Sequence, residues 1–176
     1  MKEDCPVCES IHSNEKKLYE DDKVVALMSK RPCTEGHVIV MPKEHYPIIE
    51  LVPDYIISHL FTVVNKISIA VFDAVSAQGT NILVNNGIAA GQEWAHFMVH
   101  IIPRKEGDEL SFVWNPKQLS EEEMSTIELN FKEETKNIGV FEEEKPKPVS
   151  IDKKKKEEVR IEEEENYMIN QLRRIP

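Results

Sequence analysis

The chain has 176 residues, of which 40% are hydrophobic and 31% charged, and its formal net charge is −10. This length allows one domain with its own core and an appendage, but not two full domains. The acidic balance argues against an extended nucleic-acid surface, because such surfaces carry an excess of Lys and Arg. A pocket with its own donors could still bind a small phosphorylated ligand.

The sequence gives no indication of a membrane or of secretion. No uninterrupted apolar run approaches the roughly 20 residues that a membrane span needs. The first letters, MKEDCPVC, lack the apolar core of a secretory signal. We therefore expect a soluble, cytoplasmic protein with no membrane contact.

Two of the three cysteines form a Cys-x-x-Cys pair, Cys5 and Cys8. In a reducing compartment this spacing favours a metal or redox pair over a disulfide framework. A thioredoxin-like redox pair should follow a strand, and no strand precedes this one. A chance pair without metal is the remaining alternative. Cys33 is expected to be a plain free thiol.

The first 85 residues alternate between strand patterns and one long helix pattern. Residues 17–28 (KLYEDDKVVALM) predict a hairpin, and residues 36–42 (GHVIVMP) predict a further strand. Apolar residues then recur at three- and four-residue steps after Pro53, which predicts a long helix capped at Gly79. Residues 80–85 and 94–103 are expected to be strands.

These elements predict an α+β domain over residues 1–115, with a mostly antiparallel sheet of about five strands and one long helix. Residues 116–176 are predicted to form a charged helical C-terminal extension, because half of the acidic residues fall there. Its helices are expected at about 119–136 and 152–173, separated by Pro146 and Pro148. Two interpretations of the last helix stay open, namely a solvent-exposed helix and a helix that contacts a partner subunit.

The stretch GQEWAHFMVHIIPR, residues 91–104, carries the chemistry. Side chains two apart on a strand share a face, so His96, Met98 and His100 should project to one side. This stretch, with NNGIAAGQ before it, resembles the histidine triad family, whose signature is His-x-His-x-His. The segment EGHVIVMPKEH, residues 35–45, is similar to the family's Gly-His strand, and CPVC with its hairpin is similar to the opening of many members. The resemblance covers about residues 5–113.

The resemblance implies a HIT-like fold and a nucleotidyl hydrolase or transferase in which the central histidine attacks an α-phosphorus. Met98 occupies that position here. A thioether is only a weak acceptor and cannot act as a base, so Met98 is expected to be inert. His100 lies about 6.6 Å further along an extended strand, beyond attacking distance from the same phosphorus.

The resemblance also implies ligand sets. Zinc-containing members complete a Cys-x-x-Cys pair with histidines that correspond to His45 and His96, so a closed, structural zinc site is expected. The expected phosphate contacts are Asn85, Gly91, Gln92, Glu93 and His100. Ser29 matches the ribose position, His37 lines the pocket, and Leu27 and Met28 are candidate walls for the base.

Two of these positions depart from the family pattern. Glu93 replaces a Ser or Thr that donates to phosphate, and a carboxylate there would repel it. Ser29 replaces Asp or Asn and can bond only one hydroxyl well. His37 could equally be a structural histidine, and Leu27 and Met28 could be plain core residues.

Three functions are therefore considered. The first is a nucleotide-binding protein, taking a nucleotide or dinucleotide, that has lost its chemistry. The second is a working nucleotidyl hydrolase or transferase, through His100 or because Met98 was introduced into an active protein. The third is a zinc-stabilised interaction module acting through its acidic tail. Members of the family are commonly dimers, so a homodimer is expected.

Overall fold

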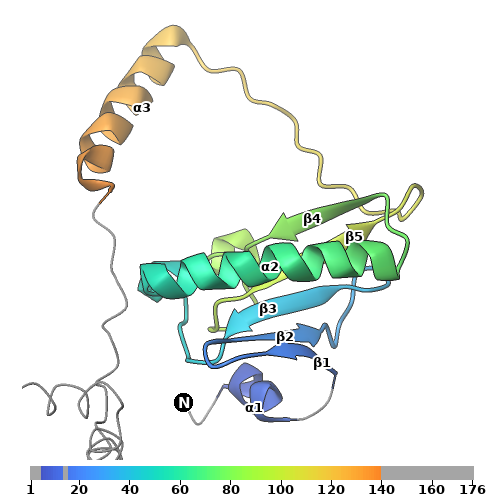
Figure 1. Ribbon diagram of the computed structural model, residues 1–176. Coiled ribbons are helices and arrows are strands. Elements are labelled where there is room, and N and C mark those ends of the chain that lie inside the picture. The colour runs from blue at the N-terminus through green and yellow to red at the C-terminus, as the bar shows by residue number, and fades with distance from the viewer. Residues whose placement is uncertain (1–4, 14–15, 140–176) are drawn as a thin grey trace, which may run out of the picture. The chain divides into compact units, whose positions relative to one another are not determined.

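The computed structural model describes residues 5–13 and 16–139. Five strands form one antiparallel sheet in the order β1-β2-β3-β5-β4 (Figure 1). Their bounds are β1 Lys17–Glu20, β2 Val24–Met28, β3 Val38–Pro42, β4 Gly79–Leu83 and β5 Val99–Arg104. The predicted α+β class and the antiparallel five-stranded sheet are confirmed.

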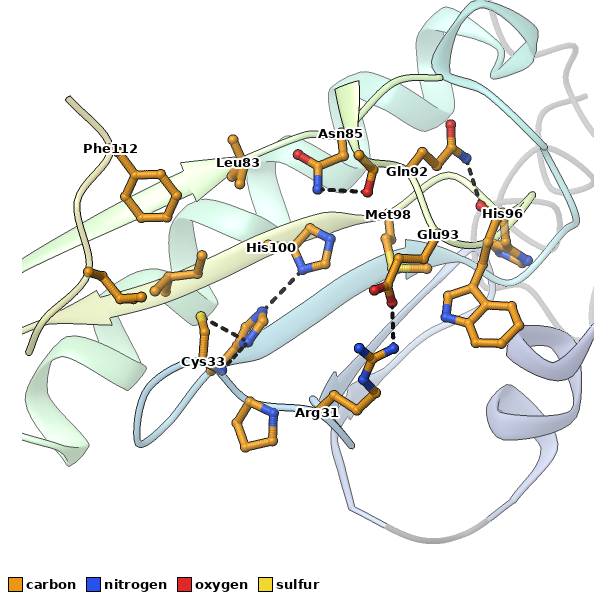
Figure 2. A pocket seen from close by; sticks show the side chains of 16 residues that line it. Arg31, Cys33, Leu83, Asn85, Gln92, Glu93, His96, Met98, His100 and Phe112 are labelled. Carbon is orange, nitrogen blue, oxygen red and sulfur yellow. Dashed lines mark hydrogen bonds and ion pairs between the residues drawn. The ribbon is translucent and has the colours of Figure 1, made fainter. Parts of the chain in front are cut away.

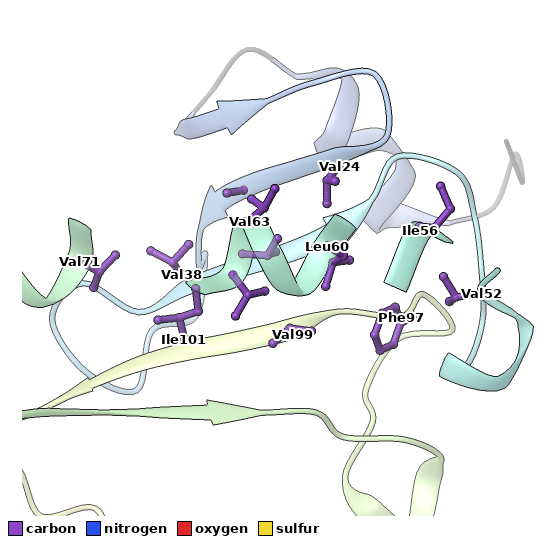
Figure 3. Packing of buried hydrophobic residues seen from close by; sticks show 13 residues of the cluster. Val24, Val38, Val52, Ile56, Leu60, Val63, Val71, Phe97, Val99 and Ile101 are labelled. Atoms are coloured by element: carbon purple, nitrogen blue, oxygen red, sulfur yellow. The ribbon is translucent and has the colours of Figure 1, made fainter. Parts of the chain in front are cut away.

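The long helix α2, Asp54–Ala74, covers one face of this sheet. Its buried face includes Leu60, Val64 and Val71, at steps of four and seven residues. These side chains pack with strand residues such as Val38 and Val99, which are buried, in the main hydrophobic core (Figure 3). The apolar periodicity of the sequence thus corresponds to the packing face of the helix.

The predicted cap of α2 at Gly79 was wrong. The helix ends at Ala74, and Ser76 takes a left-handed conformation (φ 50°) directly after the cap residue Val75. The N–H of Ala77 bonds to the carbonyl of Phe72, which is the hydrogen-bond pattern of a Schellman motif. A serine provides the turn that glycine usually provides, and Gly79 instead begins β4.

Taken by length and composition alone, α2 could cross a membrane, although the sequence showed no uninterrupted apolar run. It has 21 residues, and one third of its most apolar window is buried in the structure. A single such helix is weak evidence, because the core helix of a soluble protein meets the same criteria. Localisation therefore stays a prediction.

A short helix, α1 Pro6–His12, packs against a second hydrophobic cluster. That cluster contains Val25, Leu27 and Met41, which alternate along their strands with residues of the main core. Because side chains alternate across a strand, α1 covers the face opposite α2. The sequence analysis predicted a Cys-x-x-Cys pair but no helix here, although Pro6 at the first helical position is a helix-start signal.

Within the described residues, the remaining elements are three single-turn 3-10 helices and the helix α3, Glu121–Glu134. The 3-10 helices are η1 Ile49–Leu51, η2 Ile88–Ala90 and η3 Thr135–Asn137. The capping box of Ser120 and Glu123 begins α3, close to the predicted start. The helix predicted over 152–173 lies outside the described residues. The domain boundary predicted near residue 115 stays a prediction.

Candidate functional site

The segment that leads into β5 divides its side chains between the two faces of the sheet. Phe97, Val99 and Ile101 enter the main core beneath α2. His96, Met98 and His100 line a cleft on the other face (Figure 2). The predicted alternation is confirmed, but the predicted strand is not, because β5 begins at Val99 rather than at residue 94.

The irregular backbone before β5 explains this difference. The N–H of Phe97 bonds to the carbonyl of Tyr46, at 2.6 Å, instead of to a strand partner. The N–H of His96 turns back to the carbonyl of Trp94, at 2.7 Å. The alternation of side chains along the sequence gave no signal of this local turn or of the contact with Tyr46.

The cleft consists of two cavities of about 580 and 570 Å³. The β4 cavity extends towards Leu83, Asn85 and Phe112, and the α1 cavity extends towards α1 and the side chains of Leu27 and Met28. The two share six lining residues, namely Arg31, His37, Glu93, Trp94, Met98 and His100. Most residues predicted to contact a nucleotide are therefore gathered around one cleft.

Met98 stands at the centre of this cleft. It lines both cavities and packs its partly buried side chain against the cluster beneath α1. The position faces the space where a ligand would lie, yet it offers only a thioether sulfur, which is a weak hydrogen-bond acceptor. Met98 can therefore provide contact area but no proton transfer.

A hydrogen-bond chain fixes the protonation of His37 and His100. The backbone N–H of Cys33 donates to His37 Nδ1 at 3.3 Å, and His37 Nε2 lies 3.1 Å from His100 Nδ1. Burial lowers the pKa of His37 to about 4, and the nearby His100 ring adds to this effect. Burial also lowers the pKa of His100, although the negative charge of Glu93 acts in the opposite direction. Both rings are neutral at pH 7, so His37 donates to His100 and the remaining proton of His100 is on Nε2.

The loop before β3 places His37 in this chain. Gly36 has φ 82°, and a Cβ there would meet a methyl carbon of Val75 at 2.8 Å, so both the conformation and the space require glycine. Cys33, predicted to be a plain free thiol, is exposed, and its sulfur lies 3.5 Å from His37 Nδ1.

Cys5, Cys8, His45 and His96 form a second cluster behind the cleft, with all four candidate ligand atoms within 4.8 Å of one another. Cys8 Sγ lies 3.4 Å from His45 Nδ1 and 3.6 Å from His96 Nδ1, and Cys5 Sγ lies 3.8 Å from His96 Nδ1. Tetrahedral zinc with ordinary bond lengths separates a sulfur and a nitrogen ligand by about 3.6 Å. The spacing therefore fits a metal ion.

The ring of His96 is oriented for such a role. Its Nε2 donates to the carbonyl of Pro42 at 3.0 Å, which leaves the Nδ1 lone pair directed at the two thiols. Burial lowers the pKa of His96 and favours the neutral ring that a metal requires. The side chain is fully buried, so the cluster belongs to the interior of the domain.

Gln92 organises the loop before β5. Its amide donates to the carbonyls of Pro47 and Trp94, at 2.6 and 2.8 Å, and its oxygen accepts from the N–H of Gly87 at 2.8 Å. The side chain is thus engaged by backbone groups. Asn85 faces the β4 cavity, with a long contact of 3.4 Å to the carbonyl of Gly91.

Arg31 is one of the cleft residues that the sequence analysis missed. Its guanidinium pairs with Glu93 at 3.0 Å, across the cleft from one loop to another. Ser29, expected to contact a ribose, accepts a hydrogen bond from the backbone N–H of Arg31 at 3.2 Å. Only the tertiary fold brings Arg31 and Glu93 together, since they are 62 residues apart.

Comparison with known proteins matches the HIT domain family to residues 11–107. The adenylylsulfatase HINT3 of Arabidopsis thaliana is 40% identical over 110 residues, which are 61% of this chain and 56% of that protein. An asymmetrical bis(5′-nucleosyl)-tetraphosphatase of Schizosaccharomyces pombe is 31% identical over 114 residues, 64% of this chain and 63% of its own. The chain thus spans less than two thirds of either relative.

Solved structures agree with the fold. A HIT family protein from Bacillus subtilis superimposes with a TM-score of 0.69 at 33% identity, covering 74% of this chain and 96% of its own. A zinc-bound histidine triad family protein from Mycobacterium smegmatis gives 0.58 at 32% identity, covering 65% and 84%. A histidine triad nucleotide-binding protein from Candida albicans gives 0.66 at 28% identity, covering 74% and 96%.

Proposed function

We propose, from the premise that this chain belongs to the HIT family, that its cleft binds a nucleotide without forming a covalent nucleotidyl intermediate. The observation that carries this proposal is Met98, which faces the centre of the cleft between His96 and His100. The relatives named as an adenylylsulfatase and a bis(5′-nucleosyl)-tetraphosphatase point to an adenylyl or dinucleotide ligand.

Binding is supported by what the cleft offers to such a ligand. His100 has its proton on Nε2 and can donate to a phosphate oxygen, while His37 holds its ring in place. Apolar side chains wall both cavities, among them Leu27 and Met28 near α1 and Phe112 near β4. A few fixed polar groups within an apolar cleft are typical of small-molecule sites.

The same geometry argues against covalent catalysis. Met98 would have to become a sulfonium to carry a nucleotidyl group, and it cannot take up a proton from an attacking water. His100 cannot replace it, because its Nδ1 lone pair accepts from His37 and its Nε2 is protonated. Neither residue offers a ring nitrogen with a free lone pair directed into the cleft.

We further propose that the cluster of Cys5, Cys8, His45 and His96 binds zinc, as the distances and the zinc-bound relative support. Four protein ligands leave no coordination position for water, so the ion would be structural. It would hold α1 against the sheet and leave His96 unable to take part in phosphate chemistry.

Calorimetric titration with AMP tests the binding proposal. The natural chain should bind AMP, and His100→Ala should weaken the affinity about tenfold, because a hydrogen bond to a charged group is lost. His59→Gln serves as the control, since His59 lies on α2 and does not line the cleft. Failure of the natural chain to bind AMP would favour an interaction module instead.

A further inference from the structure

The ion pair of Arg31 and Glu93 crosses the middle of the cleft. Arg31 lies on the loop between β2 and β3, Glu93 lies on the loop before β5, and both residues line both cavities. Their side chains are 75% and 57% exposed, so the pair is in contact with solvent. Such exposed pairs contribute little to stability and exchange partners easily.

The Glu93 carboxylate lies where a ligand anion would be expected. Glu93 and His100 both line the two cavities, and the negative charge of Glu93 opposes the lowering of the His100 pKa by burial. His100 presents its Nε2–H as a donor, so an anion that accepts from His100 would compete for the same region. In the free protein, the Glu93 carboxylate thus occupies the Arg31 guanidinium that such an anion could bind.

The charges around the α1 cavity favour an anionic ligand. Lys16, Lys30 and Arg31 line it together with Glu9 and Glu93, so cations predominate locally in a chain of net charge −10. Lys30 donates to the Ser10 hydroxyl at 3.1 Å. Arg31 is distinctive because a guanidinium presents two parallel N–H donors that match two oxygens of a phosphate.

We infer that Arg31 is a phosphate-binding residue, and that Glu93 occupies its guanidinium until the phosphate of a nucleotide displaces the carboxylate. This inference rests on the proposed function and deepens it. It makes the cleft selective for nucleotides with a terminal phosphate over nucleosides, because only the phosphate can compete with Glu93. Glu93 then lowers the affinity for nucleotides in two ways, because it competes for the Arg31 guanidinium and also repels the phosphate.

A mutant cycle read by calorimetry tests the inference, with AMP and adenosine as ligands at low ionic strength. Glu93→Gln should tighten AMP binding about two- to fivefold, the range set by an exposed ion pair. Arg31→Gln introduced into the Glu93→Gln background should then weaken AMP binding about tenfold. Adenosine affinity should change less than twofold in every variant.

Glu35→Gln breaks the exposed pair with Lys105 outside the cleft and should leave AMP binding unchanged. If Arg31→Gln has no effect in the Glu93→Gln background, Arg31 merely neutralises Glu93 and the inference is wrong. If Glu93→Gln does not tighten AMP binding, the competition is absent. If neither the natural chain nor Glu93→Gln binds AMP, the proposed function itself fails.

Discussion

Single residues determine what the cleft can do, and the protonation of His37 links the cleft to pH. Because burial lowers its pKa to about 4, the folded chain resists a proton that the unfolded chain binds near pH 6.5. Its contribution to stability is therefore complete above pH 6.5 and is lost progressively as the pH falls towards 4. In denaturant unfolding, His37→Gln should lose less stability than the natural chain as the pH falls over this range. An equal loss in both chains would contradict the lowered pKa of His37.

Asp21 links the turn between β1 and β2 to α2, because its Oδ2 lies 2.6 Å from Nε2 of His59. Burial alone would raise the pKa of Asp21, but hydrogen bonds from His59, from Tyr19 and from two backbone N–H groups outweigh it and lower the pKa. The stabilisation is therefore present above about pH 4 and is lost below it. His59→Gln should destabilise the domain by about 1 kcal/mol at pH 7, measured by urea unfolding, and the difference should shrink at pH 2. An undiminished difference at pH 2 would contradict this account.

At the residue scale, the sequence predicts side-chain orientation best where successive side chains alternate between the two faces of a strand. It placed His96, Met98 and His100 on one face, and the structure gathers them in one cleft. It missed Arg31, whose relevance depends on a partner 62 residues away. It expected the Glu93 carboxylate to repel phosphate, but sequence spacing did not reveal that the Arg31 guanidinium pairs with it.

At the scale of elements, we expect the stability of α1 to depend on the proposed metal. Seven residues form an isolated helix poorly in water, and this one buries Val7, Cys8 and Ile11 against the sheet. Because α1 also walls one of the two cavities, metal removal should affect the cleft. The sequence missed α1, since seven residues carry too little periodicity to identify a helix.

Elemental analysis and chelation test this dependence. The chain as purified should contain about one zinc per chain, and a strong chelator should lower its melting temperature. Chelation should also weaken AMP binding, because the wall formed by α1 is lost. Cys8→Ser should reproduce both effects, whereas Cys33→Ser, outside the cluster, should leave the melting temperature unchanged. A metal-free chain with an unchanged melting temperature would contradict the proposed site.

At the scale of the whole molecule, the exposed surface supports the expected homodimer. Phe61, Ile69 and Phe72 lie on the outer side of α2, 38% to 54% exposed, and Ile82 is exposed on β4. β4 is an edge of the sheet and pairs only with β5 among the described strands. An apolar helix face beside an open edge is typical of a protein interface.

Ile69→Glu should therefore shift the chain from dimer to monomer in sedimentation velocity, because a charge is placed in the apolar face. Ile127→Glu on α3 is the matched control and should leave the oligomeric state unchanged. A natural chain that sediments as a monomer at micromolar concentration would overturn the dimer expectation.

Turnover measurements test most directly whether Met98 leaves the cleft without a covalent nucleophile. Adenosine phosphoramidate, adenylyl sulfate and a dinucleoside tetraphosphate should be hydrolysed by Met98→His and not measurably by the natural chain. The expected difference is about 10⁴-fold or more, the usual loss when a covalent nucleophile is missing. Turnover by the natural chain within tenfold of the Met98→His variant would contradict the account.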